Sequence, residues 1–120
     1  MSNNNSSSYE YEGLELITCV VQRGKADKVA KAAIGAGAGG ATIWFARGMG
    51  IRERLGLLGL AIVPEKEMIT IICDKKSTPV IMNAVVKAAN LEVPGMGVAY
   101  VVPITAVAGI FSAKVADPAK

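Results

Sequence analysis

The hydrophobic positions change their spacing along the first half of the chain, and these changes predict a strand, a helix and a second strand. Residues 14–22 form an apolar, β-branched run that is typical of a buried strand. In residues 25–36 the apolar side chains recur three and four positions apart, so one helical face is apolar and the lysines lie elsewhere. The glycine-rich residues 37–40 end this helix, and the apolar residues 41–46 predict the next strand.

The second half of the chain repeats this layout. A charged turn at 65–67 is expected after Pro64, and Thr78 is expected to cap a helix whose apolar positions recur at helical spacing. Pro79 suits the first position of that helix, and Asn90 can end it. The elements expected here are a strand, a helix, a glycine- and proline-rich loop and a last strand, at residues 68–73, 79–89, 91–97 and 98–102.

A longer segment without regular periodicity separates the two halves. Residues 47–59 contain four glycines and three arginines, which predicts a loop longer than a tight hairpin needs. Loops of this kind are usually functional or mobile. For the whole chain we expect a disordered polar tail at 1–12, one domain at 13–112 and a flexible C-terminus at 113–120.

The repeated order of strand, helix and strand predicts a ferredoxin-like α+β domain of βαββαβ topology. Two such units interleave into a four-stranded antiparallel sheet with both helices on one face. The other face of the sheet is then bare, and the strands at 68–73 and 98–102 carry apolar residues on both of their faces. Further copies of the same chain are the simplest cover for such a face in a small protein.

Composition and charge narrow the classes of function. The chain of 120 residues is long enough for one modest core, and with 52% hydrophobic and 19% charged residues it is globular. A formal net charge of +3 with scattered basic residues argues against nucleic-acid binding. No apolar run is long enough to span a membrane, and the polar N-terminus lacks a signal-peptide pattern, so we expect a cytoplasmic protein.

Residues with chemistry of their own are few. The chain has no histidine, and Cys19 and Cys73 lie apart in apolar runs, so we expect buried thiols in a reducing compartment and no metal site. Glu65 and Glu67 flank Lys66, which indicates a charged turn and not an acid–base pair. Because no serine or cysteine has an obvious activating base, the sequence predicts a binding protein, not an enzyme, and it assigns no cofactor.

Three stretches, together with the duplicated layout, carry a resemblance to a known family. They are residues 42–50 (TIWFARGMG), 63–66 (VPEK) and 94–103 (PGMGVAYVVP). With their spacing preserved over residues 14–107, the chain resembles the PII signalling proteins. The resemblance implies a homotrimer that binds ATP or ADP in clefts between neighbouring subunits. It also implies that the loop at 47–59, called the T-loop in that family, controls a partner protein, often a transporter or an enzyme.

The resemblance also implies which residues form the binding site. Gly95 and Gly97 would let backbone N–H groups approach a phosphate, and Lys66 would supply a positive charge to it. Arg47, Arg54 and Leu55 are the expected partner contacts in and beside the loop. The residues expected to contact the nucleotide are Thr42, Gly48, Gly50, Arg52, Lys66, Gly95, Met96 and Gly97.

Some positions depart from the family pattern and keep several alternatives open. Val98 stands where the family usually has a lysine, and residues 104–111 contain none of the arginines usual there, so ATP, ADP, AMP, another small anion or no nucleotide all remain candidates. The loop at 47–59 has no tyrosine or serine, which rules out uridylylation or serine phosphorylation there. The alternatives are a CutA-like or other small-molecule- or metal-binding trimer, with the lack of histidine against metal, and a constitutive adaptor that has lost nucleotide binding.

Overall fold

The strands and helices follow one another in the predicted order. The computed structural model describes residues 13–48 and 65–109. The strands are β1 (Leu14–Gln22), β2 (Thr42–Arg47), β3 (Glu65–Asp74) and β4 (Gly97–Pro103), and the helices are α1 (Ala26–Gly35) and α3 (Thr78–Ala89). The expectations for 1–12 and 113–120, and for most of the loop at 47–59, fall outside the described residues.

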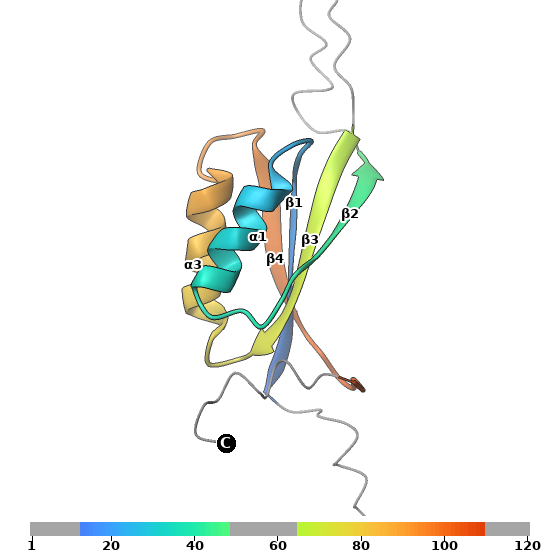
Figure 1. Ribbon diagram of the computed structural model, residues 1–120, viewed down its shortest axis with the longest axis vertical. Coiled ribbons are helices and arrows are strands. Elements are labelled where there is room, and N and C mark those ends of the chain that lie inside the picture. Colours follow the sequence, from blue (N-terminus) through green and yellow to red (C-terminus); the bar gives the residue numbers. More distant parts are fainter. Residues whose placement is uncertain (1–12, 49–64, 110–120) are drawn as a thin grey trace, which may run out of the picture.

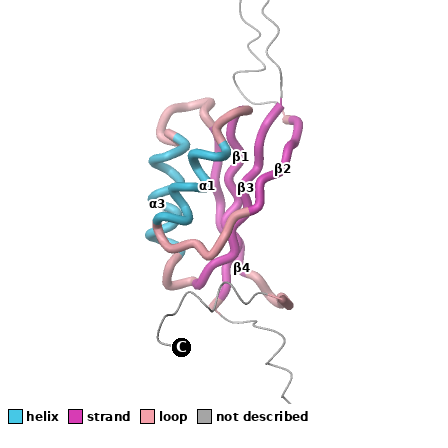
Figure 2. Tube along the Cα trace, in the orientation of Figure 1, coloured by secondary structure: helices cyan, strands magenta, loops and turns pink. Residues whose placement is uncertain are grey.

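The strands form one sheet in the order β2-β3-β1-β4, and every neighbouring pair is antiparallel. Both helices pack side by side against one face of this sheet (Figure 1). Figure 2 shows the same two layers, with the helices in cyan beside the strands in magenta. This arrangement confirms the predicted ferredoxin-like βαββαβ fold.

The hydrophobic core lies between the helices and the sheet. Successive side chains of a strand point to opposite faces, so alternate residues of β1 and β3 face the helices. Small alanines on α1 let that helix lie close to the strands. The side chains that are almost fully buried here are Ile17, Cys19, Val21, Ala26, Val29, Ala33, Ile69, Ile71, Ile81 and Val85.

The two cysteines are free and buried, as the sequence predicts. Burial raises the pKa of the Cys19 thiol to about 11. The pKa of Cys73 is also raised, first by burial and further by the nearby carboxylates of Glu15 and Asp74, although contact with the Thr78 hydroxyl opposes this. Both side chains are therefore neutral thiols at physiological pH, and they pack as small apolar groups.

The prediction of a charged turn at 65–67 is wrong, because these residues begin strand β3. Glu65 pairs with Arg47 of β2, and Lys66 pairs with both Ala46 of β2 and Gln22 of β1. Backbone pairing on both sides outweighs the low strand preference of these charged residues. Their side chains find polar partners at the end of the sheet, which makes a strand possible here.

The predicted cap of the second helix is also wrong by one residue. Thr78 is the first helical residue, and Ser77 lies at the N-cap position without a side-chain hydrogen bond to the helix. The Thr78 hydroxyl instead donates to the carbonyl oxygen of Asp74, at 3.2 Å. The left-handed φ of +57° at Asn90 ends the helix where the sequence predicts its end.

Candidate functional site

The candidate nucleotide-binding residues that the structure describes gather mostly at one end of the sheet. This is the end where β1 and β2 finish and where β3 and β4 begin (Figure 1). In the strand register, Lys66 lies opposite Gln22, and Gly97 lies opposite Val21 of the same strand β1. Residues that are far apart in the sequence are thus brought together by the antiparallel pairing of β1 with both of its neighbours.

Lys66 has little exposed surface although its side chain is charged. Its position in β3 alternates with Glu65 and Glu67, so its side chain lies on the face of the sheet opposite the helices. Only 9% of its surface is exposed. A Cβ built at Gly48 would lie 3.8 Å from the Lys66 Cγ, so the lysine stem passes beside the end of β2. An ammonium group held this way has a fixed position and is not a freely moving surface charge.

Gln22 connects Lys66 to the loop before β4, and sequence reasoning missed it. The Lys66 ammonium donates to the Gln22 Oε1 at 3.4 Å, and the Gln22 Nε2 donates to the carbonyl oxygen of Gly95 at 3.1 Å. The amide can serve both neighbours in this orientation because one needs an acceptor and the other a donor. The sequence could have indicated the contact between Gln22 and Lys66 only if residues 14–22 had been aligned antiparallel with a strand that starts at residue 65.

The loop before β4 needs glycine at two positions. Gly95 has a φ of +88°, which a residue with a side chain adopts only under strain. At Gly97 the φ is +153°, and an added Cβ would clash with the carbonyl oxygen of Val20 and press on the side chain of Leu91. The backbone of this loop can therefore lie closer to β1 than any other residue type would allow.

The remaining predicted site residues fall in three groups. Met96 lies between the two glycines and is half-buried, with its N–H donating to the Val93 carbonyl oxygen at 3.2 Å. Thr42 lies at the far end of β2, opposite Thr70 of β3, which places it roughly 13 Å along the sheet from the row of Lys66. The third group, Gly50, Arg52, Arg54 and Leu55, falls outside the described residues.

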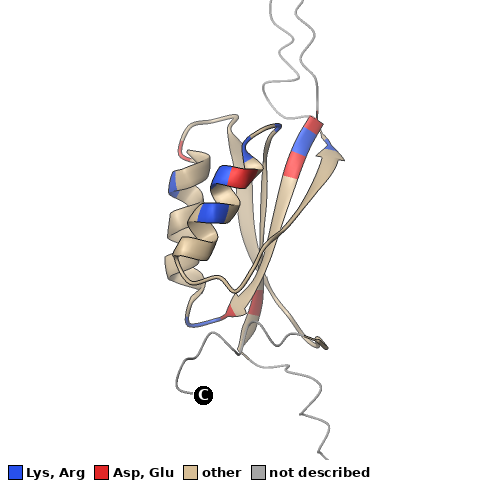
Figure 3. Cartoon of the chain, in the orientation of Figure 1, with Lys and Arg blue, Asp and Glu red and all other residues tan. Residues whose placement is uncertain are grey.

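On the helix side of the sheet, at the end where β3 begins, two glutamates bind a guanidinium group and a backbone N–H. Glu65 forms an ion pair with Arg23 at 2.8 Å. The Glu67 carboxylate accepts the backbone N–H of Ala26 at 2.8 Å, so it caps the first turn of α1 with a negative charge. Basic and acidic residues alternate along the start of β3 and again at the start of α1 (Figure 3). Both carboxylates thus have structural partners, and they do not face each other as an acid–base pair.

The face of the sheet opposite the helices is apolar and open in the single chain. Trp44 on the edge strand β2 is 50% exposed, and Val98, Tyr100 and Val102 are exposed on the same face of the opposite edge strand, β4. Within 13–48 and 65–109, no group of three or more His, Cys, Asp or Glu side chains could hold a metal ion. None of the helices described is long and apolar enough to cross a membrane.

Comparison with known proteins gives one family and one fold. The family model described as nitrogen regulatory protein P-II matches residues 14–114. Among solved structures, the chain is similar to the crystal structure of Arabidopsis thaliana PII bound to citrate, with a TM-score of 0.62 and 19% sequence identity. That match covers 84% of this chain and 86% of the Arabidopsis chain, and at this identity it shows the fold alone. A search of curated protein sequences finds no match.

Proposed function

Because the chain belongs to the nitrogen regulatory protein P-II family, we propose that it is a regulatory sensor and not an enzyme. It binds an adenine nucleotide, ATP, ADP or AMP, in clefts between subunits. The bound nucleotide changes how the T-loop between β2 and β3 engages a partner protein. The observation that supports this proposal most directly is the hydrogen-bonded chain from Lys66 through Gln22 to Gly95.

The chemistry of this chain suits an anionic ligand. The Lys66 ammonium supplies a positive charge next to the backbone of residues 95–97, where the positive φ angles of both glycines permit close approach by a ligand. Gly48, the residue after β2, has no side chain and lies beside the lysine stem. Val98 adds no charge beside this backbone, so fewer phosphates can be held than with a lysine there. Gly50 and Arg52 would complete the site from the T-loop.

The homotrimer is part of the proposal because the site is incomplete in one chain. Thr42 lies too far from Lys66 to share a ligand's phosphate end within the same subunit. A neighbouring copy that packs on the open face, over Trp44 and Tyr100, would bury exposed aromatic surface and bring a second set of site residues to the cleft. One nucleotide could then contact Thr42 of one subunit and Lys66 of another.

The partner would be a transporter or an enzyme that contacts Arg47, Arg54 and Leu55. A cytoplasmic location fits the two free, buried cysteines, since such thiols persist in a reducing compartment. One observation favours a second candidate, the constitutive adaptor. Val98 stands where the family usually has a lysine, so it supplies no charge to a phosphate beside the glycine loop.

Sedimentation velocity with ATP, followed at 260 nm, tests the trimer and the ligand together. We expect one species with about three times the 12.4 kDa chain mass, and ATP absorbance that moves with it. A trimer without moving ATP absorbance would favour the constitutive adaptor. A monomer would remove the intersubunit cleft and with it the proposed binding site.

A further inference from the structure

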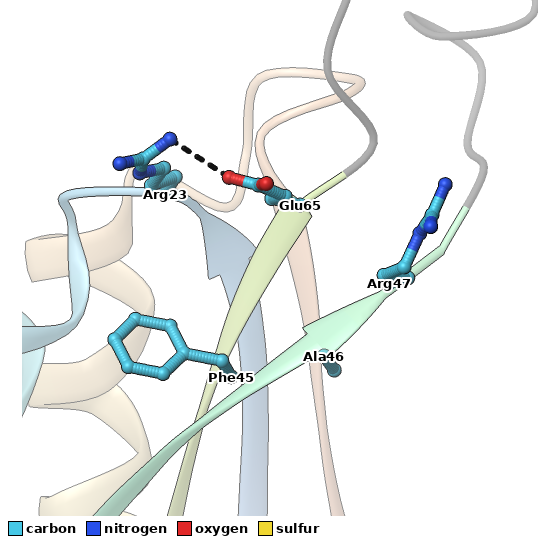
Figure 4. Close-up of a pocket in the computed structure, with 5 residues that line it drawn as sticks. All are labelled: Arg23, Phe45, Ala46, Arg47 and Glu65. Carbon is cyan, nitrogen blue, oxygen red and sulfur yellow. Dashed lines mark hydrogen bonds and ion pairs between the residues drawn. The ribbon is translucent and has the colours of Figure 1, made fainter.

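A second surface lies on the helix side of the same end of the sheet. A hollow of about 350 Å³ is lined by Arg23, Phe45, Ala46, Arg47 and Glu65. Figure 4 shows how these five side chains lie. Arg23 and Glu65 point toward each other above Phe45. Glu65 and Lys66 are consecutive residues of β3, and Arg47 pairs with Glu65, so the charged side chains of this hollow and the Lys66 side chain lie on opposite faces of the sheet. The hollow is therefore separate from the proposed nucleotide site.

Phe45 is the largest apolar group of the hollow, and 76% of it is exposed. It lies on β2, an edge strand, and it faces the helix side because it pairs with Glu67, whose carboxylate reaches α1. Ile43 is exposed on the same face of the same strand. Aromatic residues, phenylalanine included, and arginine are both enriched at protein–protein interfaces.

The charges around the ring favour an anionic partner. Arg47 lies opposite Glu65 in the strand register, yet the Glu65 carboxylate is bound to Arg23 at 2.8 Å. The Glu65 carboxylate is thus paired with Arg23, and Arg47 has no ion pair with any residue in 13–48 or 65–109. A guanidinium group binds a carboxylate best through two parallel hydrogen bonds.

We infer that this hollow docks a segment of a partner protein that presents an acidic side chain next to an aliphatic one. The aliphatic side chain packs on the exposed Phe45 ring, and the carboxylate binds the Arg47 guanidinium. This inference rests on the proposed control of a partner and extends the role of Arg47 in it, but it requires no bound nucleotide. The hollow then recognises the partner with a fixed surface on the folded domain.

Short peptides test this recognition by ¹⁵N-edited NMR titration of the full chain. The probe is acetyl-Gly-Leu-Asp-Gly-amide, and its controls carry Asn for Asp or Ala for Leu. We expect saturable shifts of the Phe45 and Arg47 amides with the probe, and about tenfold weaker binding for each control peptide. No saturable shift, or equal binding of the Asn peptide, would overturn the inference.

Matched variants locate the binding on the protein. Arg47→Gln and Phe45→Ala should each weaken the probe about tenfold, because both side chains are exposed and neither supports the core. Lys31→Gln on α1 and Val80→Ala on α3 change residues that are also exposed but lie elsewhere, and they should leave binding unchanged. Equal effects of all four variants would overturn the inference. So would a lower sedimenting mass of Phe45→Ala, since the hollow would then be a contact between subunits.

The nucleotide titration of the same variants separates this inference from the proposed function. Arg47→Gln and Phe45→Ala should bind ATP as the unaltered protein does, whether that binding is strong or absent. Loss of ATP binding in both variants would place these residues in the nucleotide cleft and would contradict a separate docking surface.

Discussion

Gly97→Ala is expected to destabilise the fold by about 2–4 kcal/mol, through backbone strain and a steric clash together. The φ of +153° disfavours any residue with a Cβ, and that Cβ would meet the carbonyl oxygen of Val20. This oxygen belongs to the β1 backbone, which pairs with β3 and β4 on its two sides, so it cannot move aside as a side chain can. Urea denaturation of both proteins measures the difference.

Two other glycines serve as controls for this variant. Gly37 has a φ of +115° and open space around its Cβ position, so Gly37→Ala carries strain without a clash. Gly35 lies at the end of α1, also in open space and without a positive φ, so Gly35→Ala should be neutral or slightly stabilising. If Gly97→Ala costs no more than Gly37→Ala, the close approach of the loop to β1 is refuted.

Lys66→Met is expected to weaken adenine-nucleotide binding more than tenfold. The methionine keeps most of the apolar stem that packs beside Gly48, while the ammonium group and its link to Gln22 are lost. A hydrogen bond to a charged group contributes about 1.5–3 kcal/mol, which corresponds to at least a tenfold change in affinity. Isothermal titration calorimetry of the variant and the unaltered protein measures this difference.

The control for this variant is Lys31→Met, which removes an exposed lysine from the outer surface of α1. It lowers the net charge equally and should leave the affinity within about twofold, because exposed charges at a distance are screened. The nucleotide affinity of Gln22→Met should fall between those of the two lysine variants. This variant keeps the Lys66 ammonium but removes the amide that links it to Gly95. Unchanged affinity in Lys66→Met would refute the lysine as a ligand contact.

Much of the fold follows from local patterns in the sequence. The apolar, β-branched run at residues 14–22 and the helical period of residues 25–36 predict elements within one residue of those observed. Residues 65–67 were missed because their strand depends on pairing with β1 and β2, which no local pattern shows. The role of Thr78 was also not visible in the local pattern. Its hydroxyl donates to the carbonyl oxygen of Asp74 in the preceding turn, and no side chain caps the helix.

In the candidate site, too, some residues can be predicted from local sequence, and others only from the pairing of distant strands. The glycines at 95 and 97 can be read from their spacing in the sequence, and both have the positive φ that favours glycine. Gln22 could not be found in this way, because an amide that joins Lys66 to Gly95 is defined only by the register of three strands. Thr42 lies apart from the other residues at the far end of β2, and in the proposed trimer it would meet them only across two subunits.

Calorimetric titration of the unaltered protein with ATP, ADP and AMP tests the proposed sensor most directly. We predict saturable heat with at least one of the three, with about one nucleotide bound per chain. The absence of heat with all three nucleotides at millimolar concentration would contradict the proposal that this chain senses adenine nucleotides.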